Sequence, residues 1–542
     1  MSLTELKRQR AAKIEQWKAI GVAPYAYRYP VTHHADTALA LGAAVTAEPG
    51  ERVRMAGRVM SLRGHGKAGF ANLLDGSGNI QLYFRSDQLG EAFRRYELLD
   101  VGDWVGVEGA LFRTRTGEIT VRVDAIELLA KSLRPPPAKW SGLKDPETRY
   151  RQRYADLFMN LEVRETFRRR ARLVTEVRAF LDARGYLEVE TPVLQPLYGG
   201  AFARPFVTRH NALDMDLYLR ISNELYLKRL IAGGLERVYE LARDFRNEGM
   251  DRTHNPEFTM LEFYQAFADM NDMMEITEQL VSEAVRQAVG QTRVTYQGET
   301  LEFAPPWARV SMPEAVSQAV GEDVRDLDPA RLARLATARG ATARPGAGAG
   351  ALLDALFDEL VQPRLRQPTF VVDHPAETSP LARPSRQTPG LVERFEAFVV
   401  GTELANAFSE QNDPAEQRAA FEAQMTRRAA GDEEAQLLDE DYLRALEYGM
   451  PPTGGVGIGL DRLVMLVTDS RSIRDVLLFP QLRPEEGRSE PEEEAAEGAV
   501  EAQASPASPA SPASPASSAS SARPASSAPP VSRSKPSDPA PR

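Results

Sequence analysis

The sequence predicts an α+β protein in three parts, because its 542 residues change character at two points along the chain. The first quarter is rich in alternating and aliphatic runs that are punctuated by turn signals. The middle interleaves long helical patterns with strand-like runs, which is typical of an antiparallel sheet flanked by helices. The end is dominated by Ala, Ser and Pro. We therefore expect a small β-barrel, a larger α+β domain and a disordered tail.

The β-rich block contains the runs "RVRMAGRVMSLRG", "GFANLLDGSGNIQLYFR", "DWVGVEGALFRT" and "GEITVRVDAIELLAKSL". Asp-Gly, Gly-Asn, Glu-Gly and Thr-Gly pairs divide them into five strands over roughly eighty residues, the rhythm of a small closed barrel of the OB type. A helix over residues 3–20 precedes the barrel, and Gly21 with Pro24 ends it. Because "LRPPPAKW" interrupts regular structure, the first domain is predicted to span residues 1–145.

The second domain is predicted over residues 146–485. Its helical patterns "VRETFRRRARLVTEVRAFLDARG" and "MNDMMEITEQLVSEAVRQAVG" alternate with the strand-like runs "LYLRIS", "RVYELARDF", "PTFVVD" and "FEAFVVG". Residues 486–542 offer too little apolar area to offset the entropy of ordering, and frequent Pro prevents a helix. That tail is predicted to be disordered.

Composition excludes several classes of function. There is no cysteine and there are six histidines, so thiol chemistry is ruled out and any metal must be held mainly by carboxylates. The N-terminus does not resemble a signal peptide, and no segment reaches membrane-spanning length. We therefore expect a soluble, cytoplasmic protein with no membrane partner. The net charge of -11 still permits a local basic groove for nucleic acid.

A predicted hairpin carries the densest set of polar residues, in "RVYELARDFRNEGMDRTHNPEFTMLEFYQAFA". Arg246 and Glu248 are two residues apart, so they are expected on one face of the first strand, and Glu262 and Tyr264 on one face of the returning strand. A ligand site and a solvated edge hairpin explain this pattern about equally well.

A second hairpin is predicted to turn at Val400 and Gly401, which places Glu403 opposite Phe398 and diagonal to Glu396. Two such carboxylates suit Mg²⁺ shared with substrate phosphates. Spacing alone favours ordinary surface acids, unless a phosphate-binding group lies nearby. The glycine run of "PPTGGVGIGLDRLV", followed by Arg462, could supply that group or could simply allow close helix–sheet packing.

Three stretches in order, "GYLEVETPVL", "FRNEGMDRTHNPEFTMLEFY" and "GGVGIGLDRLV", resemble the signature motifs of class II aminoacyl-tRNA synthetases. The lysyl subgroup is the nearest match, through "GGAFARPFVTRHNALDMDLYLRISNELYLKRL" and "TELANAFSEQNDP". The resemblance covers residues 1–484, so the larger domain would be the catalytic domain and the barrel the anticodon-binding domain. The aspartyl and asparaginyl subgroups share this architecture but differ in the middle motif and the amino-acid pocket.

The resemblance implies ATP and L-lysine as substrates, tRNA(Lys) as acceptor, Mg²⁺ as cofactor and a homodimer formed through the motif that contains Pro192. Arg246 and Arg462 would be the catalytic residues, and Glu396 and Glu403 would hold the metal. Thr253 stands where some members of the family have arginine, which puts one phosphate contact in doubt. The ATP-binding set would comprise Arg246, Asn247, Glu248, His254, Asn255, Phe258, Glu403, Leu404 and Arg462.

Lysine carries a cation at the end of an apolar stem, so its pocket should offer a buried carboxylate beside a phenol. By resemblance, Glu410 and Tyr264 occupy that end of the pocket. The whole lysine-binding set would be Gly200, Glu224, Glu262, Tyr264, Asn406 and Glu410, and the anticodon set in the barrel Phe70, Gln81, Glu127 and Arg63. Cations of the N-terminal helix, among them Arg10 and Lys13, could contact tRNA phosphates or form a solvated face.

Two other functions remain open at this point. A synthetase paralogue that no longer charges tRNA could serve as a regulator, but the intact arginines and pocket acids argue against it. A paralogue that lysylates a protein or a lipid is disfavoured by the complete barrel and by the lack of membrane-spanning segments.

Overall fold

The computed structural model describes residues 2–44, 50–137, 143–344, 346–429 and 435–485. One compact unit spans Met1–Leu482, and a second, Arg483–Arg542, lies almost wholly outside the described residues. The tail that was predicted to be disordered, 486–542, therefore lies outside them as well. No helix among the described residues is both long and apolar enough to cross a membrane.

The N-terminal strands close into the predicted barrel, in the order β1-β2-β3-β5-β4. Its interior is filled by alternating apolar residues such as Leu73, Leu82 and Val107, none of which is exposed. The barrel is confirmed as an OB-type fold, and short helices cover its connections. The elements are β1 (Arg52–His65), β2 (Ala68–Leu74), β3 (Asn79–Arg85), β4 (Trp104–Arg113), β5 (Ile119–Ala130), α2 (Ala35–Ala43), α3 (Ser86–Leu89) and α4 (Phe93–Glu97).

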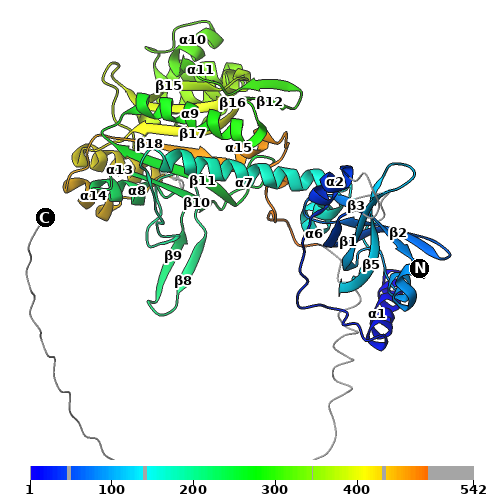
Figure 1. Cartoon of the computed structure of the whole chain (residues 1–542). Coiled ribbons are helices and arrows are strands. Elements are labelled where there is room, and N and C mark those ends of the chain that lie inside the picture. The colour runs from blue at the N-terminus through cyan, green and yellow to red at the C-terminus, as the bar shows by residue number, and fades with distance from the viewer. Residues whose placement is uncertain (1, 45–49, 138–142, 345, 430–434, 486–542) are drawn as a thin grey trace, which may run out of the picture. The chain divides into compact units, whose positions relative to one another are not determined.

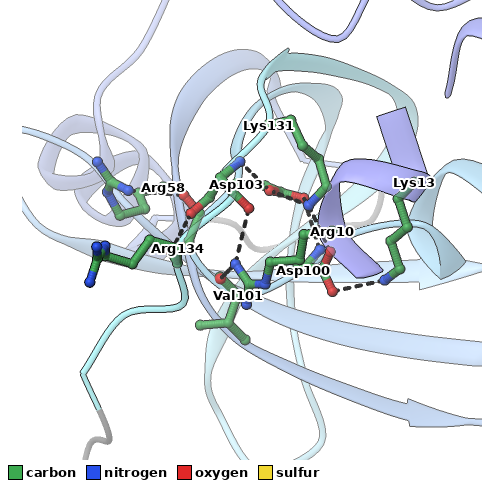
Figure 2. Close-up of polar contacts among 10 residues, drawn as sticks. Arg10, Lys13, Arg58, Asp100, Val101, Asp103, Lys131 and Arg134 are labelled. Carbon is green, nitrogen blue, oxygen red and sulfur yellow. Dashed lines mark hydrogen bonds and ion pairs between the residues drawn. The ribbon is translucent and has the colours of Figure 1, made fainter. Parts of the chain in front are cut away.

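The first helix, α1 (Leu3–Ala19), is held to the barrel by two cations, of which Arg10 is buried and Lys13 is partly exposed (Figure 2). Arg10 donates hydrogen bonds to the carbonyls of Val101 and Ser132, both at 3.1 Å, and Lys13 reaches Asp100 at 2.8 Å. These two cations are engaged within the protein, which counts against the phosphate contacts that the sequence suggested for them.

Lys131, whose side chain is fully buried, completes this cluster by pairing with Asp100 at 2.7 Å and Asp103 at 2.8 Å. Breaking a buried ion pair typically costs about 3–5 kcal/mol, since the remaining charges stay buried. We expect Lys131→Met to lower the free energy of unfolding by about this amount. The urea concentration at the midpoint of unfolding should fall accordingly. Circular dichroism of the full chain measures this shift, and an unchanged midpoint would contradict the structural role of the cluster.

The second domain is built on an eight-stranded sheet in the order β14-β15-β16-β17-β18-β11-β10-β6 (Figure 1). The pairs β14–β15 and β10–β6 are parallel and the rest are antiparallel, as predicted. The strands are β6 (Leu187–Glu188), β10 (Arg237–Phe245), β11 (Glu257–Ala266), β14 (Ala308–Ser311), β15 (Thr369–Pro375), β16 (Leu391–Val399), β17 (Thr402–Ser409) and β18 (Thr453–Gly459).

Helices α7 (Leu161–Asp182) and α9 (Met270–Val289) pack on each other, and α9 also contacts β16, β17 and β18. Together with α15 (Leu460–Val467) they bury a core that includes Phe263, Phe370 and Phe395. An Asp269 capping box begins α9, and Gly290 in the left-handed region ends it.

The other helices and strands after the barrel complete this part of the chain. They are α5 (Pro146–Arg151), α6 (Arg153–Met159), α8 (Glu224–Ala232), α10 (Met312–Val320), α11 (Pro329–Arg339), α12 (Ala349–Leu360), α13 (Pro414–Ala429), α14 (Glu440–Glu447) and α16 (Ile473–Val476), with the small sheets β7 (Leu194–Gln195), β9 (Met215–Leu219), β8 (Val207–His210) and β12 (Arg293–Tyr296), β13 (Glu299–Glu302).

One local prediction is wrong. β10 ends at Phe245, so Arg246 and Glu248 lie in the loop between β10 and β11 rather than on one face of a strand. The last paired residues of β10 and β11 are Phe245 and Glu257. The polar segment between them is longer than a tight hairpin turn, so its residues form a loop without strand pairing.

Candidate active site

Strand register places three of the predicted site residues in one row across the sheet. Glu262 of β11 pairs with Gly457 of β18, Gly457 pairs with Asn406 of β17, and Asn406 pairs with Glu396 of β16. Because residues in one row of a sheet share a face, four strands that are distant in sequence present their side chains together. Gly457, at the β18 position, has no side chain and therefore leaves open space above the middle of this row.

A cavity of about 340 Å³ opens over this row. Fourteen of the predicted ATP, lysine and metal residues line it, namely Gly200, Glu224, Arg246, Glu248, His254, Asn255, Phe258, Glu262, Tyr264, Glu396, Glu403, Leu404, Asn406 and Arg462. Asn247 and Glu410 do not line it. Asn247 is exposed and uses its backbone N–H on the Arg204 carbonyl at 2.8 Å.

The loop between β10 and β11 is shaped by Asp251, which the sequence reasoning missed. Its carboxylate accepts hydrogen bonds from the backbone N–H groups of Thr253 at 2.6 Å and His254 at 2.8 Å. Partial burial opposes ionisation, but the bonds from His254 and Thr253 outweigh it and lower the pKa of Asp251. The pattern Asp-x-Thr-His is a local side-chain-to-backbone turn signal that could have been found in the sequence.

Five cavity residues lie at the end nearest this loop. The Arg462 guanidinium donates to the Glu403 carbonyl at 2.7 Å, and its second amino group lies 3.4 Å from His254 Nε2. The Arg246 guanidinium lies 5.1 Å from the ring centre of Phe258. Two cations and an aromatic face are thus gathered where a nucleotide could bind.

Asp461 joins the two strand–helix segments that carry these residues. It accepts a hydrogen bond from the Thr259 backbone N–H at 2.6 Å and pairs with Arg170 at 2.5 Å. Arg170 also donates to the Thr259 hydroxyl at 3.0 Å. Arg170, Thr259 and Asp461 come from distant parts of the chain, so no local sequence pattern indicates that Arg170 and Asp461 position the site.

The predicted hairpin of β16 and β17 is confirmed, with Val400 and Gly401 in the left-handed region and Phe398 paired with Glu403. Burial of the Glu403 carboxylate in the cavity wall raises its pKa, and repulsion by the adjacent Glu396 carboxylate adds to this. Such repulsion is relieved by a cation between the two groups.

The described residues contain no group of three or more acidic or histidine side chains that could hold a metal. Glu396 and Glu403 both line the cavity, and Mg²⁺ commonly binds through one or two carboxylates completed by substrate phosphates. Asp354 on α12 is a further acid near the pair, and burial together with Glu396 raises its pKa to about 6 although Arg394 opposes this.

The other end of the cavity is acidic. Glu262 accepts hydrogen bonds from the Ser222 hydroxyl at 3.1 Å and the Tyr264 hydroxyl at 3.0 Å. Burial raises the pKa of Glu262 well above its ordinary value, and the carboxylates of Asp244 and Glu224 add to this.

Two glycines are required at this acidic end. Gly200 has a φ of 86°, and a Cβ there would lie 2.9 Å from the Ser222 hydroxyl. A Cβ on Gly455 would lie 2.1 Å from Glu410 Oε1 and 2.3 Å from the Tyr264 ring. Glu410 therefore lies directly behind Gly455, and it is 1% exposed.

A family model for class II tRNA synthetases (D, K and N) matches residues 145–483 of the chain, well over half of it. The chain is a class II tRNA synthetase. A second model, for the OB-fold nucleic acid binding domain of anticodon-binding type, matches residues 53–129.

Curated relatives named lysine–tRNA ligase are similar to this synthetase over most of its length. The one from Moorella thermoacetica is 53% identical, over 89% of this chain and 98% of its own. The one from Carboxydothermus hydrogenoformans is 52% identical, over 89% and 99%. The one from Trichormus variabilis is 50% identical, over 90% and 89%. The synthetase therefore belongs to the lysyl branch of the class.

The barrel of the synthetase brings three of the four predicted anticodon residues together. Arg63 pairs with Phe70, and Phe70 pairs with Tyr83 and stacks on it at 4.7 Å. Gln81 lies two residues from Tyr83 on the same strand and is held by Thr120 at 3.0 Å. Glu127 is exposed further along β5, where it pairs with Gly106.

Proposed function

We propose that the protein is a lysine–tRNA ligase, which activates L-lysine with ATP and transfers it to the terminal ribose of tRNA(Lys). The observation that carries the proposal is the polarity of the cavity: Glu224, Glu262 and Tyr264 line one end, and Arg246 and Arg462 the other. Tyr264 and Phe258 are six residues apart on β11, about 20 Å along an extended strand, so a lysyl group and a nucleotide fit end to end.

In the first step an oxygen of the lysine carboxylate bonds to the α-phosphorus of ATP, and the bond to pyrophosphate breaks. Arg246 would neutralise the developing charge on the α-phosphate, while Phe258 would stack on adenine and Arg462 would cover its other face and the γ-phosphate. His254, Asn255, Glu248 and Leu404 would complete the nucleotide contacts, with Asn247 beside them. Mg²⁺ on Glu396 and Glu403 would supply charge neutralisation for the phosphates.

In the second step a ribose hydroxyl of the tRNA attacks the lysyl carbonyl carbon, and AMP leaves. Positioning supplies most of such a rate enhancement. Arg63, Phe70, Gln81 and Glu127 would read the anticodon, with Phe70 as the stacking platform for an unstacked base. We further propose a homodimer, the domain limits 1–145, 146–485 and 486–542, and action in the cytoplasm, where the acceptor tRNA is found.

Lysine-dependent exchange of pyrophosphate into ATP, followed by charging of tRNA with a lysine anticodon, tests the function. We expect exchange with lysine and none with aspartate, whose carboxylate would need cations where this cavity has carboxylates. Asparagine should also give none, because its neutral amide leaves these carboxylates without a cationic partner. Exchange without charging, or exchange that depends on another amino acid, would overturn the proposal.

Glu403→Gln tests the metal assignment. The change removes one of the two negative charges, so the Mg²⁺ concentration for half-maximal exchange should rise by about tenfold or more. Glu302→Gln, at a half-exposed acid paired with Arg293 away from the cavity, is the matched control. An unchanged Mg²⁺ requirement in Glu403→Gln would contradict the role of this carboxylate.

A further inference from the structure

A buried lysine lies behind the acidic end of the cavity. Lys228 is in the first turns of α8, and its side chain is fully buried. Its ammonium nitrogen lies 2.5 Å from Glu224 Oε1 and forms an ion pair with Oε2 of Glu410. The ring of Phe408 is 6.0 Å away on the third side. Burying a lysine is costly without such partners, so its presence requires an explanation.

Glu410 is left with one oxygen uncommitted. Both carboxylate oxygens of Glu410 are buried, and neither has a hydrogen bond of regular geometry within the part of the chain that the structure describes, but Oε2 is the oxygen that pairs with the Lys228 ammonium. Oε1 points toward Gly455, because a Cβ at that position would lie 2.1 Å from it. Gly455 itself lines the cavity. A glycine thus opens the space between the cavity and the free carboxylate oxygen.

The groups around Glu410 set its charge. They come from three elements: Glu224 and Lys228 on α8, Tyr264 on β11 and Tyr442 on α14. Two further charged groups lie behind these phenols, Glu262 at Tyr264 and Arg229 at Tyr442. Burial raises the pKa of Glu410 above its ordinary value, while Lys228 opposes this and Glu224 adds to it. Burial in turn works against charge on Lys228, but Glu224 and Glu410 outweigh it and raise its pKa above the ordinary value.

We propose that Lys228 is a positioning residue for the amino-acid substrate: its ammonium group anchors Glu410 through Oε2 and leaves Oε1 for the side-chain ammonium of the incoming lysine. The proposal rests on the proposed function, since it concerns the same pocket. A carboxylate can accept several donors, so a protein ammonium on one oxygen and a substrate ammonium on the other satisfy it together. The substrate then meets a carboxylate whose ionised form Lys228 favours and whose orientation is already set.

Lys228→Met keeps an unbranched side chain that is one atom shorter and removes the charge. Without the cation, burial favours the protonated form of Glu410, which cannot pair with a substrate ammonium until it loses that proton. Since one pKa unit is a factor of ten, we expect the KM for lysine in pyrophosphate exchange to rise by about tenfold or more near pH 7. The KM should then fall toward the wild-type value as the pH rises to about 9, because the carboxylate form returns above its pKa.

The KM for ATP should change by less than about twofold, because α8 does not supply the nucleotide contacts. Selectivity for lysine over norleucine, which lacks only the side-chain amino group, should also fall, since a neutral Glu410 no longer discriminates by charge. A structural role alone would lower the melting temperature without a pH-dependent KM.

Lys131→Met is the matched control, because it removes another fully buried lysine that is paired with two carboxylates, in the barrel. It should leave the KM for lysine unchanged. Lys228→Arg keeps the charge and protects the test if the methionine variant does not fold. Its KM should rise less than about tenfold and should not recover at higher pH.

The outcomes separate the two proposals. If wild-type protein shows no lysine-dependent exchange, the proposed function fails. If wild-type protein exchanges but Lys228→Met keeps its KM and its selectivity, the positioning role of Lys228 is refuted. A large rise in KM for Lys228→Arg that recovers between about pH 7 and 9 would refute it equally, because charge would then not be the relevant property.

Discussion

Glu410→Gln should lower kcat/KM for lysine in pyrophosphate exchange by about a hundredfold or more, because a buried carboxylate that pairs with a cation is replaced by a neutral amide. The substrate ammonium would then enter a pocket whose ionised partner is missing, next to the buried Lys228 charge. Both effects act on the lysine side chain and not on the nucleotide. The KM for ATP in the same assay should stay near the wild-type value.

Stability provides the internal check on this variant. Glutamine can still accept a hydrogen bond from Lys228, and Glu224 still pairs with that lysine at 2.5 Å, so the chain should fold. Glu440→Gln is the control for the same chemical change and should leave kcat/KM unaltered. Glu440 is an exposed acid on α14 that pairs with Arg418 on α13. Normal lysine activation by Glu410→Gln would refute both the pocket assignment and the role of Lys228.

Arg246→Ala should lower kcat for pyrophosphate exchange by about a thousandfold, because it removes a cation from the position where charge develops on the α-phosphate. The guanidinium lies 5.1 Å from the Phe258 ring and also favours the ionised form of Glu403 across the cavity. Arg246→Lys keeps a charge but not the planar fork of donors, so it should recover activity only in part.

Arg243→Ala is the matched control, since Arg243 is an exposed arginine on β10 just before the loop. The contact that its backbone carbonyl makes with Arg220, at 2.9 Å, survives the substitution. Single-turnover measurements would show whether the loss in Arg246→Ala lies in the chemical step. An Arg246→Ala variant with wild-type kcat would contradict the assignment of this residue to the phosphate.

The local features of this protein could be predicted from its sequence. Strand alternation and turn pairs predicted the barrel, and the Val400-Gly401 turn correctly placed Glu403 opposite Phe398. Both depend on residues close in the chain, where periodicity and turn geometry determine which side chains share a face. The family motifs then added the roles that spacing alone left undecided between a site and a solvated surface.

Contacts between distant segments were decided only by the tertiary structure. Arg246 and Glu248 lie in a loop because the β10–β11 ladder ends at Phe245, before it reaches either of them. Glu224 and Lys228 are one helical turn apart in the sequence, which signals a pair, but the approach of Glu410 from the end of β17 turns that pair into a buried triad. Periodicity describes which face a residue occupies, whereas burial and charge depend on what packs against that face, and packing is a property of the whole fold.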